Sequence, residues 1–148
     1  MMDEPKMLPH KQAVHYIRRQ AKRLQRLLHF GKHGDWCINI VAVDADHVGH
    51  CGQESLVGWQ QSTPPYFSAD IEIPTRHPRK VLLQAVVHEH LHVAMADVRR
   101  AVTIISGGDT ESVAWRMYDD AEERAVTRLE RAFVALLAGD FMTGGQDR

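Results

Sequence analysis

Residues 88 to 92, near the middle of the chain, carry the side chains with the most specific chemistry. They read His-Glu-His-Leu-His, with two histidines four residues apart and a glutamate directly after the first. Residues four apart share one face of a helix. His88 and His92 can therefore offer two imidazoles to one zinc ion, with Glu89 beside them as a general base. This spacing predicts metal-assisted hydrolysis.

The helix that must hold this pair is expected to be buried. The segment that starts at Pro78 and runs to about Arg100 is apolar nearly all round in its first half, which is typical of a central helix. Proline suits the first turn of such a helix. Imidazoles in so apolar a setting need partners, and a bound metal ion provides one.

A third ligand is expected from the last helix of the chain. A catalytic zinc site takes three protein ligands and keeps one position open. The predicted helix begins at Asp109 or Thr110, runs to about Ala138 and stops at Gly139. Four acidic residues lie close together on it: Asp119, Asp120, Glu122 and Glu123.

Helical phase separates the two glutamates. Steps of three and four residues back from Phe133 and Val126 reach Glu122 and then Tyr118, whereas Glu123 lies about 100° round the helix. A carboxylate on an apolar stripe needs a partner, such as a metal ion. We therefore expect Glu122 to be the third ligand. Glu123 is the less favoured choice. The alternatives without a metal are a salt bridge from Glu122 to Arg124 or Arg128, or a solvated face.

The remaining elements predict an α+β domain. Pro9 to Phe30 has the period of an amphipathic helix, and Gly31 suits its stop. Trp36 to Val43 is rich in β-branched residues, and Ser55 to Gln60 is a shorter candidate strand. Tyr66 to Ile73 alternates apolar and polar residues, which indicates a strand at a sheet edge or with one exposed face. Helix, strands, helix and helix in this order favour the α+β class.

Length and composition favour an ordinary globular protein. We expect 148 residues to form one domain over 1–148, with mobile tails at about 1–8 and 143–148. No apolar run approaches the roughly 20 residues that span a bilayer, and the first residues do not resemble a secretory signal. Cys37 and Cys51 do not make a disulfide framework, although a single bridge between them stays open. These features predict a cytoplasmic protein with no membrane contact.

Charge is distributed unevenly along the chain, although the formal net charge is only −1. Residues 1 to 33 carry eight Lys and Arg against Asp3 and Glu4, whereas the segment from Asp109 onward is net acidic. We interpret the basic face of the first helix as a solvated surface. A contact with nucleic acid or an acidic protein is less favoured, because no aromatic residues lie between the charges.

Two further groups of histidines have weaker interpretations. His90 faces away from the zinc pair and is expected at the surface or at the edge of the core. His47, His50 and Cys51 could form a second metal cluster, but their spacing matches no strong template, so a plain loop is favoured.

The residues also resemble a known family. The HExxH motif at 88–92, followed about 30 residues later by Glu122-x-x-Ala125, is similar to the gluzincin type of zinc metallopeptidase. The resemblance is strongest to small single-domain phage and bacterial members, including the ImmA/IrrE-like group. The resemblance covers roughly residues 36 to 137. It implies a zincin-like fold with an N-terminal helix, a small mixed sheet, a buried HExxH helix and a C-terminal glutamate helix.

The same resemblance implies roles for individual residues. His88, His92 and Glu122 would bind Zn²⁺, and Glu89 would be the base. Such families often carry Asp or Asn four residues after the ligand glutamate, where this chain has Val126. Another group must then orient a ligand histidine, and the candidates are Asp97 and Asp119.

Substrate contacts are expected on the strand that precedes the HExxH helix. By resemblance to zincins, the half-polar segment from Ser68 to Ile73 could pair its backbone with an extended peptide, which makes Ser68 and Asp70 candidate substrate-binding residues. Tyr118 is a third candidate. An oxyanion donor is also needed, and Tyr118, His77 or His50 could provide it.

The leading expectation is therefore a zinc-dependent peptidase with a restricted intracellular protein target; cleavage of a repressor or regulator would be by analogy only. The alternative is a weak or inactive zinc-binding protein of the same fold that acts in assembly for a phage or mobile element. A nucleic-acid-associated factor is a third hypothesis. Activity that depends on Glu89 separates the first two. The sequence does not predict an oligomeric state.

Overall fold

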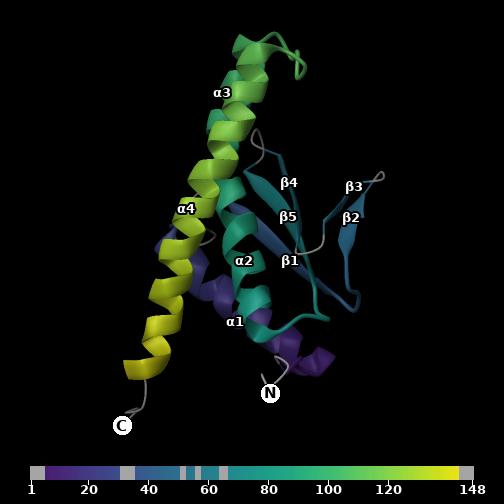
Figure 1. Cartoon of the computed structure of the whole chain (residues 1–148), viewed down its shortest axis with the longest axis vertical. Helices are drawn as coiled ribbons and strands as arrows, with labels where there is room; N and C mark the ends of the chain where they lie inside the picture. Colours follow the sequence, from purple (N-terminus) through teal and green to yellow (C-terminus); the bar gives the residue numbers. More distant parts are fainter. Residues whose placement is uncertain (1–5, 31–35, 51–52, 56–57, 64–66, 144–148) are drawn as a thin grey trace, which may run out of the picture.

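In this computed structural model the described residues are 6–30, 36–50, 53–55, 58–63 and 67–143, and they form helices and strands of an α+β fold (Figure 1). In chain order these are α1 (His10–Leu27), β1 (Cys37–Val43), β2 (Val48–His50), β3 (Gln53–Ser55), β4 (Trp59–Thr63), β5 (Ser68–Pro74), α2 (Arg79–Ala94), α3 (Ala96–Ile105) and α4 (Val113–Thr143). The predicted α+β class is confirmed.

The main sheet has three strands in the order β1-β5-β4. β1 runs parallel to β5, with Cys37 opposite Ser68, and β4 runs antiparallel to it, with Trp59 opposite Glu72. β2 and β3 form a separate antiparallel pair. β5 is therefore a central strand with one exposed face and not a sheet edge, so the second of the two expected alternatives holds. Its alternation separates buried Ile71 from exposed Asp70.

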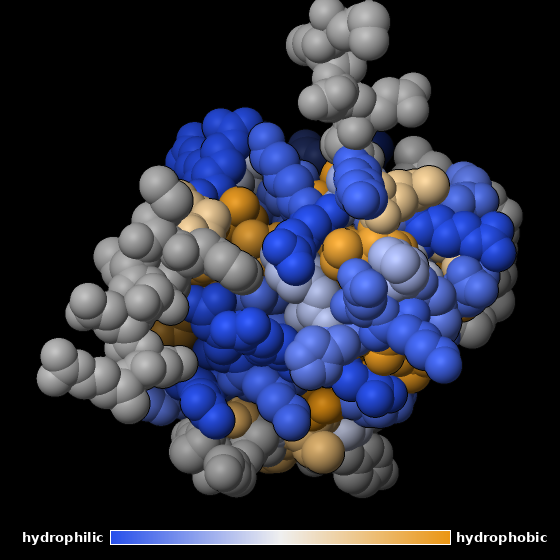
Figure 2. All heavy atoms as spheres, turned by 90° about the horizontal axis from the view of Figure 1, so that it is seen from below, coloured by the Kyte–Doolittle hydropathy of each residue, from blue (hydrophilic) through white to orange (hydrophobic). Residues whose placement is uncertain are grey.

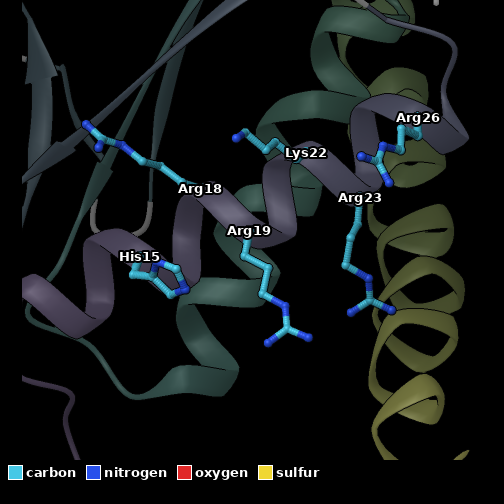
Figure 3. Close-up of a pocket in the computed structure, with 6 residues that line it drawn as sticks. All are labelled: His15, Arg18, Arg19, Lys22, Arg23 and Arg26. Carbon is cyan, nitrogen blue, oxygen red and sulfur yellow. The ribbon is translucent and has the colours of Figure 1, made fainter. Parts of the chain in front are cut away.

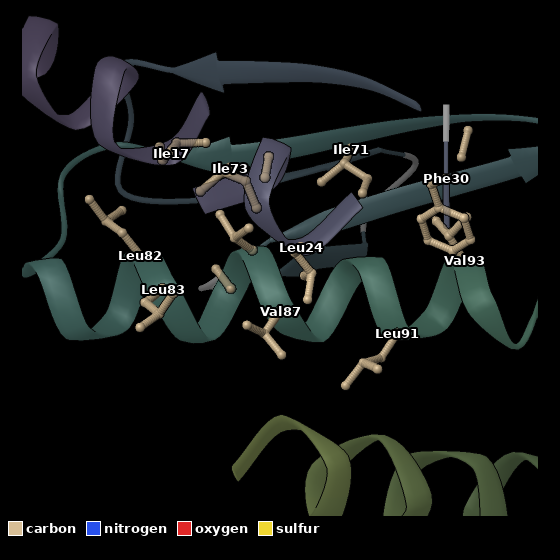
Figure 4. Close-up of a cluster of buried hydrophobic side chains, with 14 of the residues drawn as sticks. Ile17, Leu24, Phe30, Ile71, Ile73, Leu82, Leu83, Val87, Leu91 and Val93 are labelled. Carbon is tan, nitrogen blue, oxygen red and sulfur yellow. The ribbon is translucent and has the colours of Figure 1, made fainter. Parts of the chain in front are cut away.

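The core lies between this sheet, α1 and α2, and α4 covers the other side of α2 (Figures 1 and 4). Ile17 and Leu24 of α1 meet Ile71 and Ile73 of β5, and all four side chains are fully buried. Leu91 of α2 points toward α4 (Figure 4). Because α2 is enclosed by the sheet, α1 and α4, its sequence is apolar nearly all round, as predicted for a central helix.

The helix boundaries differ from the expectation in two places. α2 ends at Ala94, and a turn at Met95 separates it from α3, whereas one helix to about Arg100 was expected. No Pro or Gly stands at this junction, so the local sequence does not signal it. α4 begins at Val113 and continues through Gly139 to Thr143. One helical glycine costs only about 1 kcal/mol relative to alanine, which a long helix tolerates.

The N-terminal segment is partly fixed in place. Met7 forms a β-bridge with Pro78, and Leu8 packs against the core, so the tail expected at 1–8 is ordered at these two positions. Residues 1–5 and 144–148, and the expected helix stop at Gly31, lie outside the described residues. Cys37 is an exposed free cysteine, and Cys51 lies outside the described residues.

The described surface is mixed in character. Viewed from the lower end of Figure 1, it is mostly hydrophilic, with small apolar areas between the polar side chains (Figure 2). None of the described helices has the length and hydropathy that crossing a bilayer requires.

Candidate metal centre

The two histidines of the HExxH motif lie on one face of α2, as their spacing predicts. The Nε2 atoms of His88 and His92 are 3.1 Å apart. The ring centroids are 4.8 Å apart, with the rings at a steep angle. His92 is nearly buried, and the side chain of His88 is 29% exposed, so the pair lies at the border between core and solvent.

Glu123 of α4 supplies a carboxylate to this pair. Its Oε1 lies 3.1 Å from Nε2 of His92, and its Oε2 lies 4.0 Å from Nε2 of His88. One ligand atom from each of the three side chains falls within 4.8 Å of the others. Donors placed tetrahedrally at zinc–ligand distances of 2.0–2.1 Å stand about 3.3 Å apart. Two imidazoles and a carboxylate are donors that zinc accepts. The two separations of 3.1 Å match this spacing, whereas the 4.0 Å between Glu123 and His88 is longer.

The expectation that Glu122 is the third ligand does not match this geometry. Glu122 is buried, as its helical phase predicts. However, its Oε1 lies 2.8 Å from Nδ1 of His92, the ring nitrogen that does not face His88. Its Oε2 accepts a hydrogen bond of 3.0 Å from Nε of Arg99. An imidazole and a guanidinium compensate the burial of this carboxylate, so no metal ion is needed to explain it.

Each histidine of the pair has a carboxylate on its Nδ1 atom. Glu122 takes this place for His92, and Oε2 of Glu130 lies 3.1 Å from Nδ1 of His88. Such carboxylates hold the proton on Nδ1 and leave Nε2 free to bind a metal ion. Glu122 and Glu130 are one turn before and after fully buried Val126. They therefore provide the orienting groups that Val126 cannot.

Neither residue first considered for this orienting role contacts the histidines. Asp97 makes no described interaction with them, and Asp119 accepts a hydrogen bond of 3.0 Å from Nη2 of Arg99. Arg99 of α3 thus binds Asp119 and Glu122 together. Burial would raise the pKa of Glu122, but hydrogen bonds from His92 and Arg99 lower it to about 2. The carboxylate is consequently charged whenever the protein is folded near neutral pH.

Tyr118, a candidate substrate contact, lies behind this arrangement. The guanidinium of Arg99 is 6.0 Å from the Tyr118 ring centroid and 5.7 Å from that of Trp115. Burial raises the pKa of the Tyr118 phenol, so its proton is retained at neutral pH. These contacts give Tyr118 a place in the support of Arg99 and Glu122.

Glu89 is a buried carboxyl group beside the histidine pair. It is 6% exposed, and Gly58 closes over it: a Cβ atom added at Gly58 would lie 2.9 Å from both Cγ and Oε1 of Glu89. Burial raises the pKa of Glu89 to about 7, while His92 lowers it and Glu123 raises it. A carboxyl group in this range can both accept and return a proton at neutral pH.

The strand expected to bind substrate has no free edge. From Ser68 to Glu72 the backbone of β5 is paired with β1 on one side and β4 on the other, so the prediction that it pairs with a peptide is wrong. Asp70 instead accepts a hydrogen bond of 3.0 Å from Nδ2 of Asn39. Among the described strands of this sheet, β4 has the open edge next to α2, and Gly58 immediately precedes it.

His90 and His77 have hydrogen-bond partners outside the candidate metal centre. His90 is fully buried and not at the surface or core edge: its Nδ1 donates to the carbonyl of Val86 (2.6 Å), and Gln25 donates to its Nε2 (3.2 Å). Burial lowers the pKa of His90 to about 4. His77 lies in the loop before α2, and its Nε2 donates to the backbone carbonyl of Asp46. The side chain of His50 and all of Cys51 lie outside the described residues.

Comparisons with protein-family models, with curated proteins and with solved structures found nothing that matches this chain. The functional interpretation therefore depends on the geometry of the centre.

Proposed function

We propose that this protein is a zinc-dependent metallopeptidase with a zincin-like fold, in which His88, His92 and Glu123 hold the metal. The observation that carries the proposal is the convergence of the two Nε2 atoms and the Glu123 carboxylate, all within 4.8 Å of one another, beside a buried glutamate. A bound zinc ion supplies Lewis-acid polarisation of a carbonyl group and makes water more acidic.

In this proposal Glu89 moves the proton. It is directly next to His88 in the chain, buried, and close enough to His92 and Glu123 for their charges to act on its pKa. It would accept a proton from the attacking water and deliver it to the leaving amine. Glu122 and Glu130 act as positioning residues, because each holds the Nδ1 atom of one imidazole. Arg99 in turn holds the Glu122 carboxylate.

The surroundings of β4 support a peptide as the substrate. An extended peptide can add to the open edge of a sheet through backbone hydrogen bonds. The chain enters β4 beside the Glu89 carboxyl group, and Ser62 near the other end of the strand borders a hollow of about 330 Å³. The other lining residues are Ala96, Arg99, Arg100, Thr103, Ile104 and Trp115. A peptide along β4 would thus pass the proposed base and reach a side-chain pocket.

The test is cleavage of a peptide library derived from a cell proteome, with new termini identified by mass spectrometry. We expect the zinc-loaded protein to produce new termini, a chelator to stop this, and added zinc to restore it. Failure of the zinc-loaded protein to cleave any peptide, or cleavage that survives removal of the metal, would contradict the proposal. The restricted target is a further proposal, which a short, consistent list of cleaved peptides would support.

Gly58→Ala is expected to reduce cleavage while leaving zinc bound. The new methyl group would meet the Glu89 carboxyl group at 2.9 Å, so the buried side chain must shift. A displaced catalytic group commonly lowers the rate, and we expect a loss of at least about tenfold. The measurement is initial cleavage rate together with zinc content. Gly139→Ala is the matched control, because a methyl group there meets nothing within 4 Å. Equal cleavage rates for the two variants would show that a side chain at position 58 does not displace the catalytic base.

A further inference from the structure

α1 carries a strongly basic outer face. The helix contains six Arg and Lys residues and no Asp or Glu. Its apolar side chains, including Ala13, Ile17 and Leu24, are buried against the core and fix the helix in place. The cations follow one another at steps of three and four residues, which places them along one side of a helix. We call this surface, formed by Lys11, His15, Arg18, Arg19, Lys22, Arg23 and Arg26, the basic face.

The basic face is hollowed. A hollow of about 520 Å³ is lined by all of its members except Lys11, and their side chains project from the ribbon of α1 (Figure 3). A second hollow of about 340 Å³ shares His15 and Arg19 with the first and adds Lys11 and Arg79. Among the described residues, no Asp or Glu lines either hollow. The two hollows thus adjoin along α1, and the charged side chains that line them in the described part of the chain are cationic.

The length of this surface suits an extended polyanion. From Lys11 to Arg26 the helix rises about 22 Å at 1.5 Å per residue. A nucleic-acid duplex carries about one negative charge per 1.7 Å of its axis with both strands counted, so about 13 charges lie along this length and part of them can face the protein. Arginine predominates, and its planar guanidinium matches phosphate oxygens better than an ammonium group does. Arg23 donates to Gln20 and Arg79 lies over the Tyr16 ring, but the other cations suffice for such contacts.

We propose that the basic face binds the phosphodiester backbone of a nucleic-acid duplex without reading its base sequence. A protein partner would be expected to bury apolar anchors, but the hollow of 520 Å³ is lined by cations and one histidine alone. Insertion into lipid would require an apolar face, and that of α1 is already used in the core. Tyr16 lines the hollow of 340 Å³, but it is buried and Arg79 lies over its ring, so it does not present an open ring face on which single-stranded bases could stack.

The binding should be weak and strongly dependent on salt. Non-specific complexes of this kind have dissociation constants on the order of 10⁻⁴ to 10⁻⁶ M at physiological salt. With about five phosphate contacts, the affinity should fall about 500-fold between 50 and 200 mM salt. Fluorescence anisotropy with labelled 20-base-pair DNA and RNA duplexes measures both quantities. Binding of both duplexes fits a shared backbone contact, and preference for one identifies the source of the phosphates.

The discriminating variant is Arg19→Gln/Lys22→Gln/Arg26→Gln. Glutamine keeps the helix propensity of these exposed positions, so the fold should persist, which circular dichroism can verify. We expect the affinity at 50 mM salt to fall at least about tenfold and the salt slope to decrease by about 3. The matched control, Arg116→Gln/Arg128→Gln/Arg131→Gln, makes the same change in net charge on exposed positions of α4 and should bind like the wild type.

Three outcomes would overturn this inference. The first is an equal loss of affinity in the two triple variants. The second is binding of poly-glutamate with the affinity of the duplex, which would indicate an acidic protein partner. The third is binding of vesicles rich in phosphatidylserine but not of duplexes. The inference is independent of the proposed metallopeptidase activity, so His88→Ala/His92→Ala should bind duplex normally if folded.

Discussion

Glu89→Gln is expected to abolish peptide hydrolysis and to leave zinc bound. Glutamine keeps the size of the buried side chain beside Gly58 but cannot accept a proton. Loss of a general base typically lowers a rate by about 10²–10⁴-fold. The side chain is not among the three groups that converge as ligands, so metal affinity should not change. Cleavage rate and zinc content are measured on the same preparation.

The control for this variant is Glu111→Gln, which makes the same chemical change at an exposed position before α4. It should cleave at the rate of the wild type. If Glu89→Gln loses its zinc, Glu89 belongs to the ligands. If it cleaves within about tenfold of the wild type, Glu89 is not the base.

Glu123→Gln and Glu122→Gln are expected to separate metal binding from folding stability. Glu123 is half exposed and makes its closest described contacts with the two histidines. Glu123→Gln should therefore lower zinc affinity at least about tenfold. The free energy of unfolding of the metal-free protein should change by less than about 0.5 kcal/mol. Glu122 is buried between His92 and Arg99. Glu122→Gln leaves the Arg99 guanidinium without this carboxylate and should lower the free energy of unfolding of the metal-free protein by about 3 kcal/mol.

Zinc titration and urea unfolding of the metal-free proteins provide the two readouts. Glu122→Gln should also bind zinc more weakly, because His92 loses the group that orients it. For each variant, the loss of zinc affinity is therefore compared with the loss of unfolding free energy. Glu123→Gln should lose mainly zinc affinity, as a ligand would, and Glu122→Gln should lose both. Unchanged stability in Glu122→Gln with complete loss of zinc, alongside normal zinc binding in Glu123→Gln, would restore Glu122 as the ligand.

The central helix could be predicted from the sequence because its signals are local. Histidines four residues apart, an apolar segment and Pro78 together determine α2 and the face that carries the pair. The buried position of Glu122 followed from the period of α4 in the same way. Glu130 lies seven residues after Glu123, which places the two glutamates on the same side of α4. This spacing was a signal that could have identified the partner of His88.

Other features depend on which elements meet in space. Helical phase gives the direction of Glu122 but not the identity of its partner, and Arg99 reaches it from α3 only because the chain turns at Met95. β5 lies between β1 and β4, which is a matter of long-range strand order that alternation of side chains does not encode. For this reason the sequence left open whether β5 is an edge strand, and it did not identify β4 as a strand with an open edge.

The most direct test of the central claim is the zinc content of protein purified without chelator, compared with His88→Ala/His92→Ala. The wild type should contain close to one zinc ion per chain, and the double variant almost none. His15→Ala/His47→Ala removes two exposed histidines and serves as the matched control, which should keep its zinc. Circular dichroism of all three proteins verifies folding. Full zinc retention by folded His88→Ala/His92→Ala, or a wild type that binds no zinc when the ion is supplied, would contradict the account.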